Sequence, residues 1–145
     1  MNAALHSINW TISHPEIVIV SDIHLLGQGE PRSDLLLTLL DCMLEQKPKR
    51  FIFLGDIFEF CFGSTKYFQS KFNYIQKKVE ALAANGTEVI FFEGNHEFDL
   101  EALNWQGVRF VGEGDLVLSA LNQKLILAHG DLVYSDLKYR LFRGF

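Results

Sequence analysis

The sequence contains few cysteines and none of the segments that direct a chain into or across a membrane. Cys42 and Cys61 are its two cysteines, and they form no CxxC pair. This scarcity excludes a disulfide scaffold and predicts buried free thiols in a reducing compartment. No apolar run approaches the ~20 residues that span a bilayer. Residues 1–16 lack the basic start, apolar middle and small-residue cleavage site of a signal peptide, so we expect a cytoplasmic protein.

Basic residues are also scarce. Thirteen lysines and arginines stand against 18 aspartates and glutamates, which gives a formal net charge of −5. A general nucleic-acid binder normally presents a basic face, so we expect no nucleic-acid partner. A substrate that carries phosphate is still compatible with this charge, because bound divalent cations reverse the local field.

The chain does contain enough apolar sequence for one folded core. It has 145 residues, of which 48% are hydrophobic and 21% charged, and this predicts a single globular domain over residues 1–145, with 1–15 as a lead segment. Short apolar runs rich in β-branched and aromatic residues predict strands. These runs are residues 16–21, 50–54, 88–92, 108–111, 116–121 and 124–128.

Helices are predicted between these strands. Ser33 or Asp34 is expected to cap the first helix, which runs to about Gln46. The second is expected to be one helix that ends at Asn85-Gly86, and its apolar residues recur at steps of three and four. These residues are Phe68, Phe72, Ile75, Val79 and Leu82. Alternating strands and helices predict an α/β fold with a parallel sheet. A short helix near 100–105, a second sheet after it and a helical segment from Ser135 are also expected.

Four polar blocks follow the apolar runs at the points where the strands are predicted to end. In open α/β sheets the ligand site lies beyond the carboxyl ends of the strands. The blocks bring carboxylate, imidazole and amide groups to that edge, including three of the five histidines, which predicts a metal site. They are Asp22-Ile23-His24, Gly55-Asp56-Ile57-Phe58-Glu59, Gly94-Asn95-His96-Glu97 and His129-Gly130-Asp131.

The first two blocks supply carboxylates and one imidazole. Asp22 and His24 are alternate residues, so in extended geometry both side chains point the same way and form half of a transition-metal shell. Asp56 has two carboxylate oxygens and can bridge two cations, although capping a following helix is the alternative role. Gly55 lets the chain turn sharply and is expected to keep the space beside that carboxylate clear.

The last two blocks add an amide and two more imidazoles. Asn95 offers an amide oxygen to a hard or borderline cation, and its neighbour His96 is expected to act as a proton donor. His129 offers a further imidazole at the same edge. Two cations ~3.5–4 Å apart favour in-line hydrolysis of a phosphoester or pyrophosphate.

In this order the blocks resemble the calcineurin-like metallophosphoesterase superfamily, whose pattern is D-x-H, G-D, G-N-H-[DE], H and G-H-x-H. Four of the five elements are present. The resemblance implies an αββα sandwich, in which helices flank two mixed sheets, and two divalent metal ions. Mn²⁺ is the first choice, with Fe or Zn²⁺ as alternatives.

The resemblance also implies roles for individual residues. The metal ligands would be Asp22 and His24 for the first ion, Asp56 for both ions, and Asn95 and His129 for the second. His96 would contact the phosphate and protonate the leaving group, with Asn95 beside it in the catalytic site. Glu59 would support a ligand or the local structure rather than bind metal directly, and Asp131 would hydrogen-bond a ligand histidine. The residues that would support ligands or contact the substrate are Glu59, Asp131, Tyr139 and Arg143.

A narrower resemblance concerns the UDP-2,3-diacylglucosamine diphosphatases, which release UMP and lipid X in lipid A synthesis. Residues 55–63 are similar to their G-D-[LI]-F-E-x-x-x-G, and Asp136, Tyr139 and Arg143 extend the likeness. It implies a lipid-nucleotide substrate and peripheral association with the inner face of the membrane.

One motif departs from that narrower group and leaves the substrate open. The group commonly has G-N-R-D, whereas residues 94–97 read G-N-H-E. A nucleotide, another phosphodiester or a phosphoprotein is therefore the alternative substrate. Phe58, Phe60 and Phe62 are expected to pack in the core rather than contact an acyl chain or a base.

The last element of the superfamily pattern, G-H-x-H, is absent. Its two histidines supply one ligand to each metal, so we expect the chain to correspond to the N-terminal part of an enzyme, with an incomplete second sheet. We also expect weak or no activity from these residues alone, and self-association through an exposed sheet edge. A catalytically silent scaffold that binds a partner protein is the alternative.

Overall fold

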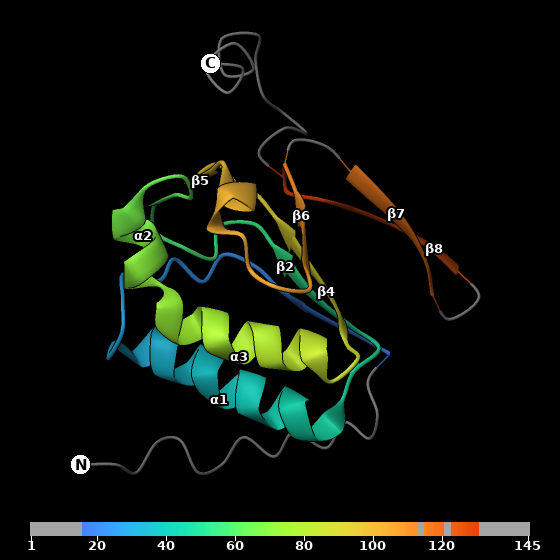
Figure 1. Ribbon diagram of the computed structural model, residues 1–145. Helices are drawn as coiled ribbons and strands as arrows, with labels where there is room; N and C mark the ends of the chain where they lie inside the picture. Colours follow the sequence, from blue (N-terminus) through green and yellow to red (C-terminus); the bar gives the residue numbers. More distant parts are fainter. Residues whose placement is uncertain (1–15, 113–114, 121–122, 131–145) are drawn as a thin grey trace, which may run out of the picture.

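The computed structural model describes residues 16–112, 115–120 and 123–130. A four-stranded parallel sheet in the order β1-β2-β4-β6 lies at its centre (Figure 1). Its strands are β1 (Ile17–Val20), β2 (Arg50–Leu54), β4 (Glu88–Phe92) and β6 (Val108–Val111). The parallel sheet confirms the prediction from strand–helix alternation, and it brings the carboxyl ends of all four strands to one edge.

Two helices cover one face of this sheet. Figure 1 shows α1 (Pro31–Gln46) and α3 (Asn73–Ala84) side by side beneath the strands. Their buried residues pack on the aromatic side chains of β2 and β4, where the rings of Phe53 and Phe91 stack with centroids 4.7 Å apart. Successive side chains of a strand point to opposite faces, so these phenylalanines belong to the helix side.

A hairpin covers the opposite face. Strands β7 (Asp115–Ala120) and β8 (Gln123–Ala128) pair antiparallel, as predicted from their sequence. Buried residues of the hairpin and of the sheet form a second core, made of Leu118, Leu127, Ile52, Ile90 and Phe92. The described residues therefore form a helix layer, a parallel sheet and a two-stranded layer, and within these ranges no helix covers the hairpin as a full αββα sandwich requires.

The helix boundaries differ from the prediction in two places. α1 begins at Pro31 with Glu30 at the N-cap, because the fixed φ of proline suits the first helical position. Ser33 is buried instead, and its hydroxyl donates to the Gly27 carbonyl at 2.6 Å. The second predicted helix is divided at Phe72 into α2 (Lys66–Lys71) and α3, whereas its predicted end is confirmed by Gly86 at φ +96°.

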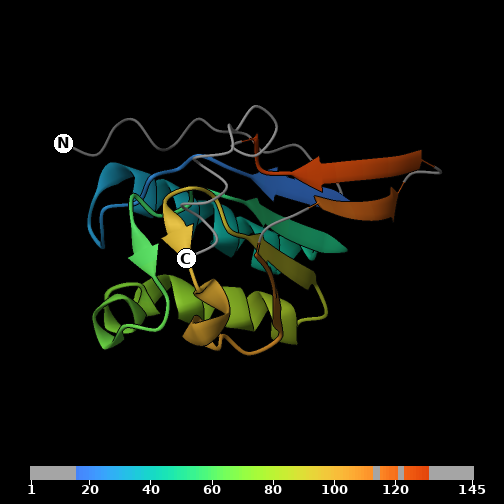
Figure 2. The ribbon, with the colours of Figure 1, turned by 90° about the horizontal axis from the view of Figure 1, so that it is seen from above.

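Two short strands lie beyond the carboxyl ends of the main sheet. β3 (Cys61–Phe62) and β5 (Glu97–Phe98) pair in parallel there, as Figure 2 shows from above. A 3₁₀ helix, η1 (Leu100–Leu103), occupies the place of the predicted short helix. None of the described helices has the length and apolar character needed to cross a membrane.

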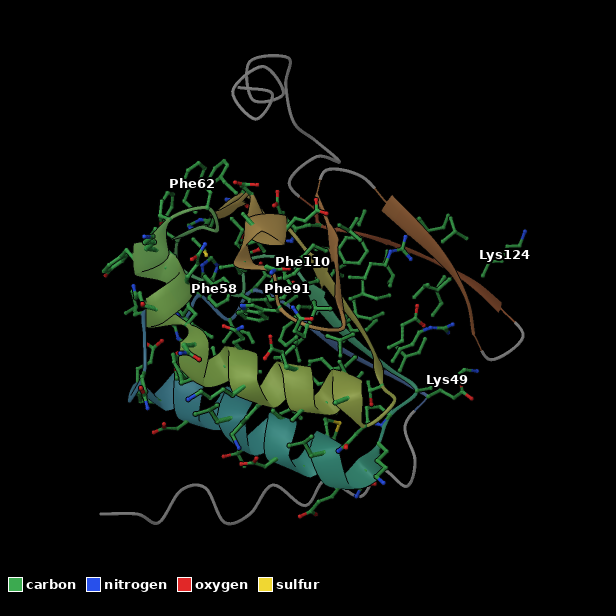
Figure 3. All side chains as sticks on the ribbon, viewed as in Figure 1. Lys49, Phe58, Phe62, Phe91, Phe110 and Lys124 are labelled. Carbon is green, nitrogen blue, oxygen red and sulfur yellow. The ribbon has the colours of Figure 1, made fainter. Side chains whose placement is uncertain are left out.

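The phenylalanines after β2 do not share one environment. Phe58 is fully buried and stacks on Phe72 with centroids 4.0 Å apart, as expected of a core residue. Phe60 and Phe62 are 50% and 42% exposed, so the prediction that they pack in the core is wrong. Figure 3 shows Phe58 inside the molecule and Phe62 at its periphery. The short β3 strand turns these two side chains outward.

Candidate metal centre

Backbone hydrogen bonds join the loop after β1 to the loop after β2. The N–H of Asp22 donates to the carbonyl of Gly55 at 3.1 Å, and the N–H of His24 donates to the carbonyl of Asp56 at 3.0 Å. The pairing between the two strands thus continues beyond their ends. It brings Asp22 and His24 beside Asp56, although the three residues come from different parts of the chain.

These three residues share an unusual backbone conformation. Asp22, His24 and Asp56 have φ angles of 54°, 53° and 52°, in the left-handed region that non-glycine residues seldom adopt. The expectation that Asp22 and His24 converge through extended geometry is therefore wrong. They converge through left-handed turns, and the ligand atoms of all three residues lie within 4.8 Å of one another. Strain of this kind persists only where surrounding contacts enforce it.

Asp56 lies at the centre of the group, with its side chain only 6% exposed. Its Oδ1 accepts a hydrogen bond from the N–H of His96 at 3.0 Å. Its Oδ2 lies 4.0 Å from His24 Nε2 and 3.6 Å from His129 Nε2. One carboxylate oxygen therefore faces two imidazoles that come from different strand ends.

His129 and Asn95 form the other side of the group. His129 Nδ1 donates to the carbonyl of Leu54 at 2.9 Å, which leaves Nε2 of the neutral ring as an acceptor. That Nε2 lies 3.4 Å from Asn95 Oδ1 and 3.6 Å from Asp56 Oδ2. Three acceptor atoms that converge in this way fit a cation, and the carbonyl that holds Nδ1 orients the ring for it.

His24 provides a second observation that fits a metal. Its Nδ1 is buried and makes no hydrogen bond within the described part of the chain, but it lies 3.4 Å from Glu59 Oε2. His96 stands edge-on to this ring at 4.9 Å, and its Nδ1 donates to the carbonyl of Glu59 at 2.6 Å. Ligand atoms of His24, Glu59 and His96 also lie within 4.8 Å of one another. Glu59 is thus in direct contact with His24.

Two glycines make room for these contacts. A Cβ at Gly94 would lie 2.1 Å from Asp56 Oδ1, so Gly94 is the residue that clears the space beside this carboxylate. Gly55, which the sequence suggested for that role, has φ +83° and lies against His129, where a Cβ would meet Nδ1 at 2.3 Å. The sharp turn expected at Gly55 is confirmed, and the space that it clears belongs to the imidazole.

Glu97 is the residue of this region to which sequence reasoning gave no role. It is fully buried, and its carboxylate accepts hydrogen bonds from the backbone N–H groups of Asp56, Ile57, Phe58 and Gly94 at 2.8–3.1 Å. Burial raises the pKa of Glu97 to about 7, although the N–H groups of Gly94 and Phe58 act to lower it. The available signal was the acidic position that ends the G-N-H-[DE] element.

The structure brings together most of the residues singled out from the sequence. Those that meet at the carboxyl edge of the sheet are Asp22, His24, Asp56, Glu59, Asn95, His96 and His129. Asp131, Tyr139, Arg143 and the helical segment predicted from Ser135 lie outside the described residues. The nitrogen and oxygen donors of the group fit divalent cations of the transition series.

The fold is that of an α/β protein, and groups that could hold metal ions lie at the carboxyl edge of its parallel sheet. The family model described as calcineurin-like phosphoesterase matches residues 15–143. The chain belongs to this family, whose members are generally metal-dependent hydrolases.

Several similar proteins are described as UDP-2,3-diacylglucosamine hydrolase. That of Vibrio vulnificus is 30% identical over 139 residues, which cover 87% of this chain and 52% of the relative. Those of Vibrio parahaemolyticus and Ralstonia nicotianae are 28% and 27% identical, with 87% and 88% of this chain and 52% and 48% of the relatives covered. The chain thus spans about half the length of these relatives.

Among solved structures, the crystal structure of Pseudomonas putida nuclease MPE aligns with a TM-score of 0.46 and 19% identity. The alignment covers 68% of this chain and 48% of that one.

Proposed function

We propose that this chain contributes the metal-binding groups of a two-metal phosphoester or pyrophosphate hydrolase. The observation that carries the proposal is the position of Asp56 Oδ2, which faces His24 Nε2 at 4.0 Å and His129 Nε2 at 3.6 Å. A single carboxylate oxygen between two imidazoles suits a ligand shared by two cations. Membership of the calcineurin-like phosphoesterase family supports the same chemistry.

The contacts described above support an assignment of each ligand. Asp22 and His24 would hold one cation, Asn95 and His129 the other, and Asp56 both. When bound, a pair of divalent cations supplies a nucleophile at neutral pH and neutralises charge on the phosphate oxygens. The carbonyl of Leu54 holds His129 in the tautomer that offers Nε2 to a cation. Glu59, whose carboxylate lies beside His24 Nδ1, would either orient the His24 ring or bind a cation itself.

His96 would supply the proton for the leaving oxygen. Its Nδ1 donates to the carbonyl of Glu59, which fixes the ring and leaves Nε2 to carry the exchangeable proton. Its backbone N–H is bound to Asp56 Oδ1 at the same time, so the ring is held at a fixed place beside the ligand group. A positioned general acid of this kind typically contributes about 10²–10⁴-fold to a rate.

For the substrate, we propose an amphiphilic nucleotide of the UDP-2,3-diacylglucosamine type. The name of the relatives supports this choice, and so does an aromatic surface beside His96. The rings of Phe60, Phe62 and Tyr67 are 50%, 42% and 66% exposed, and the N–H of Cys61 donates to the carbonyl of His96 at 3.0 Å. Acyl chains would find apolar surface next to the phosphate-binding groups. The G-N-H-E motif keeps a simpler phosphodiester as the second candidate.

The first experiment tests the metal site. Isothermal titration with Mn²⁺ should show two ions per wild-type chain. Asp56→Asn should weaken the binding of both ions by more than about 100-fold. This loss of affinity is larger than the one that typically follows mutation of a residue that only supports a metal ligand. Asp41→Asn, on the exposed face of α1 in an ion pair with Lys78, is the matched control and should bind like wild type. A wild-type chain that binds no Mn²⁺ at millimolar concentration would contradict the proposal.

The second experiment tests the substrate. Turnover by this chain alone, which we expect to be weak, should be faster for UDP-2,3-diacylglucosamine than for bis(p-nitrophenyl) phosphate at equal Mn²⁺ loading. Replacement of both Phe60 and Phe62 by alanine should lower kcat/KM for the lipid about tenfold, because a tenfold change corresponds to the free energy gained by burying one aromatic side chain against the substrate. The simple diester should be hydrolysed equally by both forms. A clear preference for the simple diester would favour the second candidate.

A further inference from the structure

Crossed hydrogen bonds tie the loop that carries Asp56 to the loop that carries Asn95. The Glu97 carboxylate reaches from the second loop to the backbone N–H groups of residues 56–58. The Asp56 carboxylate reaches back in the opposite direction to the N–H of His96. Each loop thus holds the other through a carboxylate, and the two carboxylates belong to residues 41 positions apart.

The geometry at Glu97 requires a carboxylate and not merely a polar group. Oε1 accepts the N–H groups of Ile57 and Phe58 at 2.8 and 3.0 Å. Oε2 accepts those of Asp56 and Gly94 at 3.1 and 2.9 Å. An amide has one acceptor oxygen, and its NH₂ group would face two N–H donors. A glutamine at this position would therefore release one pair of backbone groups.

The turn that the Glu97 carboxylate holds has a strained backbone at Asp56. Asp56 has φ 52° and follows Gly55 at φ +83°, and a non-glycine residue keeps this strained conformation only where its surroundings enforce it. Three consecutive N–H groups that converge on one anion form a nest, a conformation that such an anion stabilises. Release of that anion would let the turn relax and would move Asp56 Oδ2 away from His24 and His129.

We propose that Glu97 is a positioning residue for the metal centre: it holds the Asp56 turn so that one carboxylate oxygen faces both His24 and His129, and it thereby sets the affinity for the two cations. This role rests on the proposed function. Glu97 acts through the backbone of its neighbours and touches neither the substrate nor the reacting atoms.

The test compares Mn²⁺ binding by wild type and by Glu97→Gln, which keeps the size of the side chain. Titration calorimetry, at a temperature where circular dichroism shows every variant folded, should give affinities 10–100-fold weaker for the variant. The electron paramagnetic resonance of bound Mn²⁺ should also lose the coupling expected of two ions that share a ligand. Glu97→Asp keeps the charge but is one methylene shorter, and it should bind with intermediate affinity.

The control separates stability from affinity. Thr87→Val removes another buried hydrogen bond, from the threonine hydroxyl to the carbonyl of Pro48, at the amino end of the sheet. It should lower the melting temperature and leave Mn²⁺ affinity within about twofold of wild type. If Glu97→Gln fails to fold, the Mn²⁺ affinity of Glu97→Asp, measured by the same titration, tests the proposal instead.

Two outcomes would overturn the proposal in different ways. Wild-type Mn²⁺ affinity and coupling in the folded Glu97 variants would refute the positioning role and leave the proposed function standing. Failure of the wild-type chain to bind Mn²⁺ would refute the proposed function and, with it, this role.

Discussion

Asp56 shows how one side chain can depend on its neighbours for its chemical role. Its carboxylate is almost fully buried, and its backbone occupies the left-handed region. The N–H of His96 donates a hydrogen bond to Oδ1, so Oδ2 is the oxygen that faces the imidazoles of His24 and His129. The distinction between the two oxygens comes from a backbone group of another loop, because both oxygens of an isolated carboxylate are equivalent.

Gly94 offers a test of how closely this carboxylate is held. In Gly94→Ala the new Cβ would fall 2.1 Å from Asp56 Oδ1 and 2.4 Å from Asp56 N, so the turn must move. We expect Mn²⁺ affinity to fall at least about tenfold and the free energy of unfolding to fall by about 1–3 kcal/mol, as for other overpacked sites. Calorimetry and chemical denaturation measure the two effects.

The control for this substitution is Gly27→Ala. The nearest atom to a Cβ at Gly27 is Lys71 Cε at 3.6 Å, an ordinary contact, so both quantities should stay close to wild type. Unchanged Mn²⁺ affinity in Gly94→Ala would show that the Asp56 turn adapts and that its position is not critical.

At the scale of elements, strands β2 and β4 are buried on both faces. Phe51 and Phe53 belong to the core on the helix side, whereas Ile52 between them packs against the hairpin. A strand in this position is a continuous apolar run rather than an alternating pattern, which is why residues 50–54 and 88–92 were recognisable from sequence. The division of the second helix at Phe72 was not, since Phe72 stays buried and keeps the apolar repeat intact.

The loop after β2 gives a prediction about these layers. Phe58 is fully buried and stacks on Phe72 and Phe91, with centroids 4.0 and 5.7 Å away. Phe58→Ala should therefore lower the free energy of unfolding by about 3–5 kcal/mol. Phe60→Ala, two residues along on the exposed side, should change it by no more than about 0.5 kcal/mol. Equal losses in a urea titration would mean that both rings belong to one core.

At the scale of the whole molecule, the parallel sheet has two edges. Among the described residues β1 pairs with β2 and β6 pairs with β4, each on one side. Beside β1 a cavity of about 780 Å³, lined by apolar side chains of β1 and α1, extends to Asp22 and His24. Ile19 of β1 and Leu35 of α1 are 42% and 43% exposed there. An edge of this kind accepts a further strand.

Self-association was expected through the edge of an incomplete second sheet, and that stays a prediction. The β1 edge is another place at which the chain could pair with a second copy, and Ile19 is the residue that tests it. Sedimentation velocity should show the wild-type chain shifting to larger species as its concentration rises. Ile19→Lys places a charge on the edge and should weaken association at least about tenfold, by loss of one buried aliphatic contact. A wild-type chain that stays monomeric across the concentration range would contradict the prediction.

The sequence alone determined the four strands of the main sheet, their parallel arrangement and the polar blocks at their ends. These features are local: a buried strand is an apolar run, and the residue that follows it lies at the sheet edge wherever the strand is placed. The same blocks carried the resemblance to the calcineurin-like phosphoesterases, which the family match confirms.

Only the tertiary structure decided how those blocks meet. The left-handed turns at Asp22 and His24, the choice of Asp56 Oδ2 and the outward position of Phe60 depend on contacts between distant segments. Glu97 is the clearest example, because its partner Ile57 lies 40 residues earlier in the chain. A pattern of neighbouring residues cannot encode such a contact, since the sheet must form before the two loops lie within hydrogen-bonding distance.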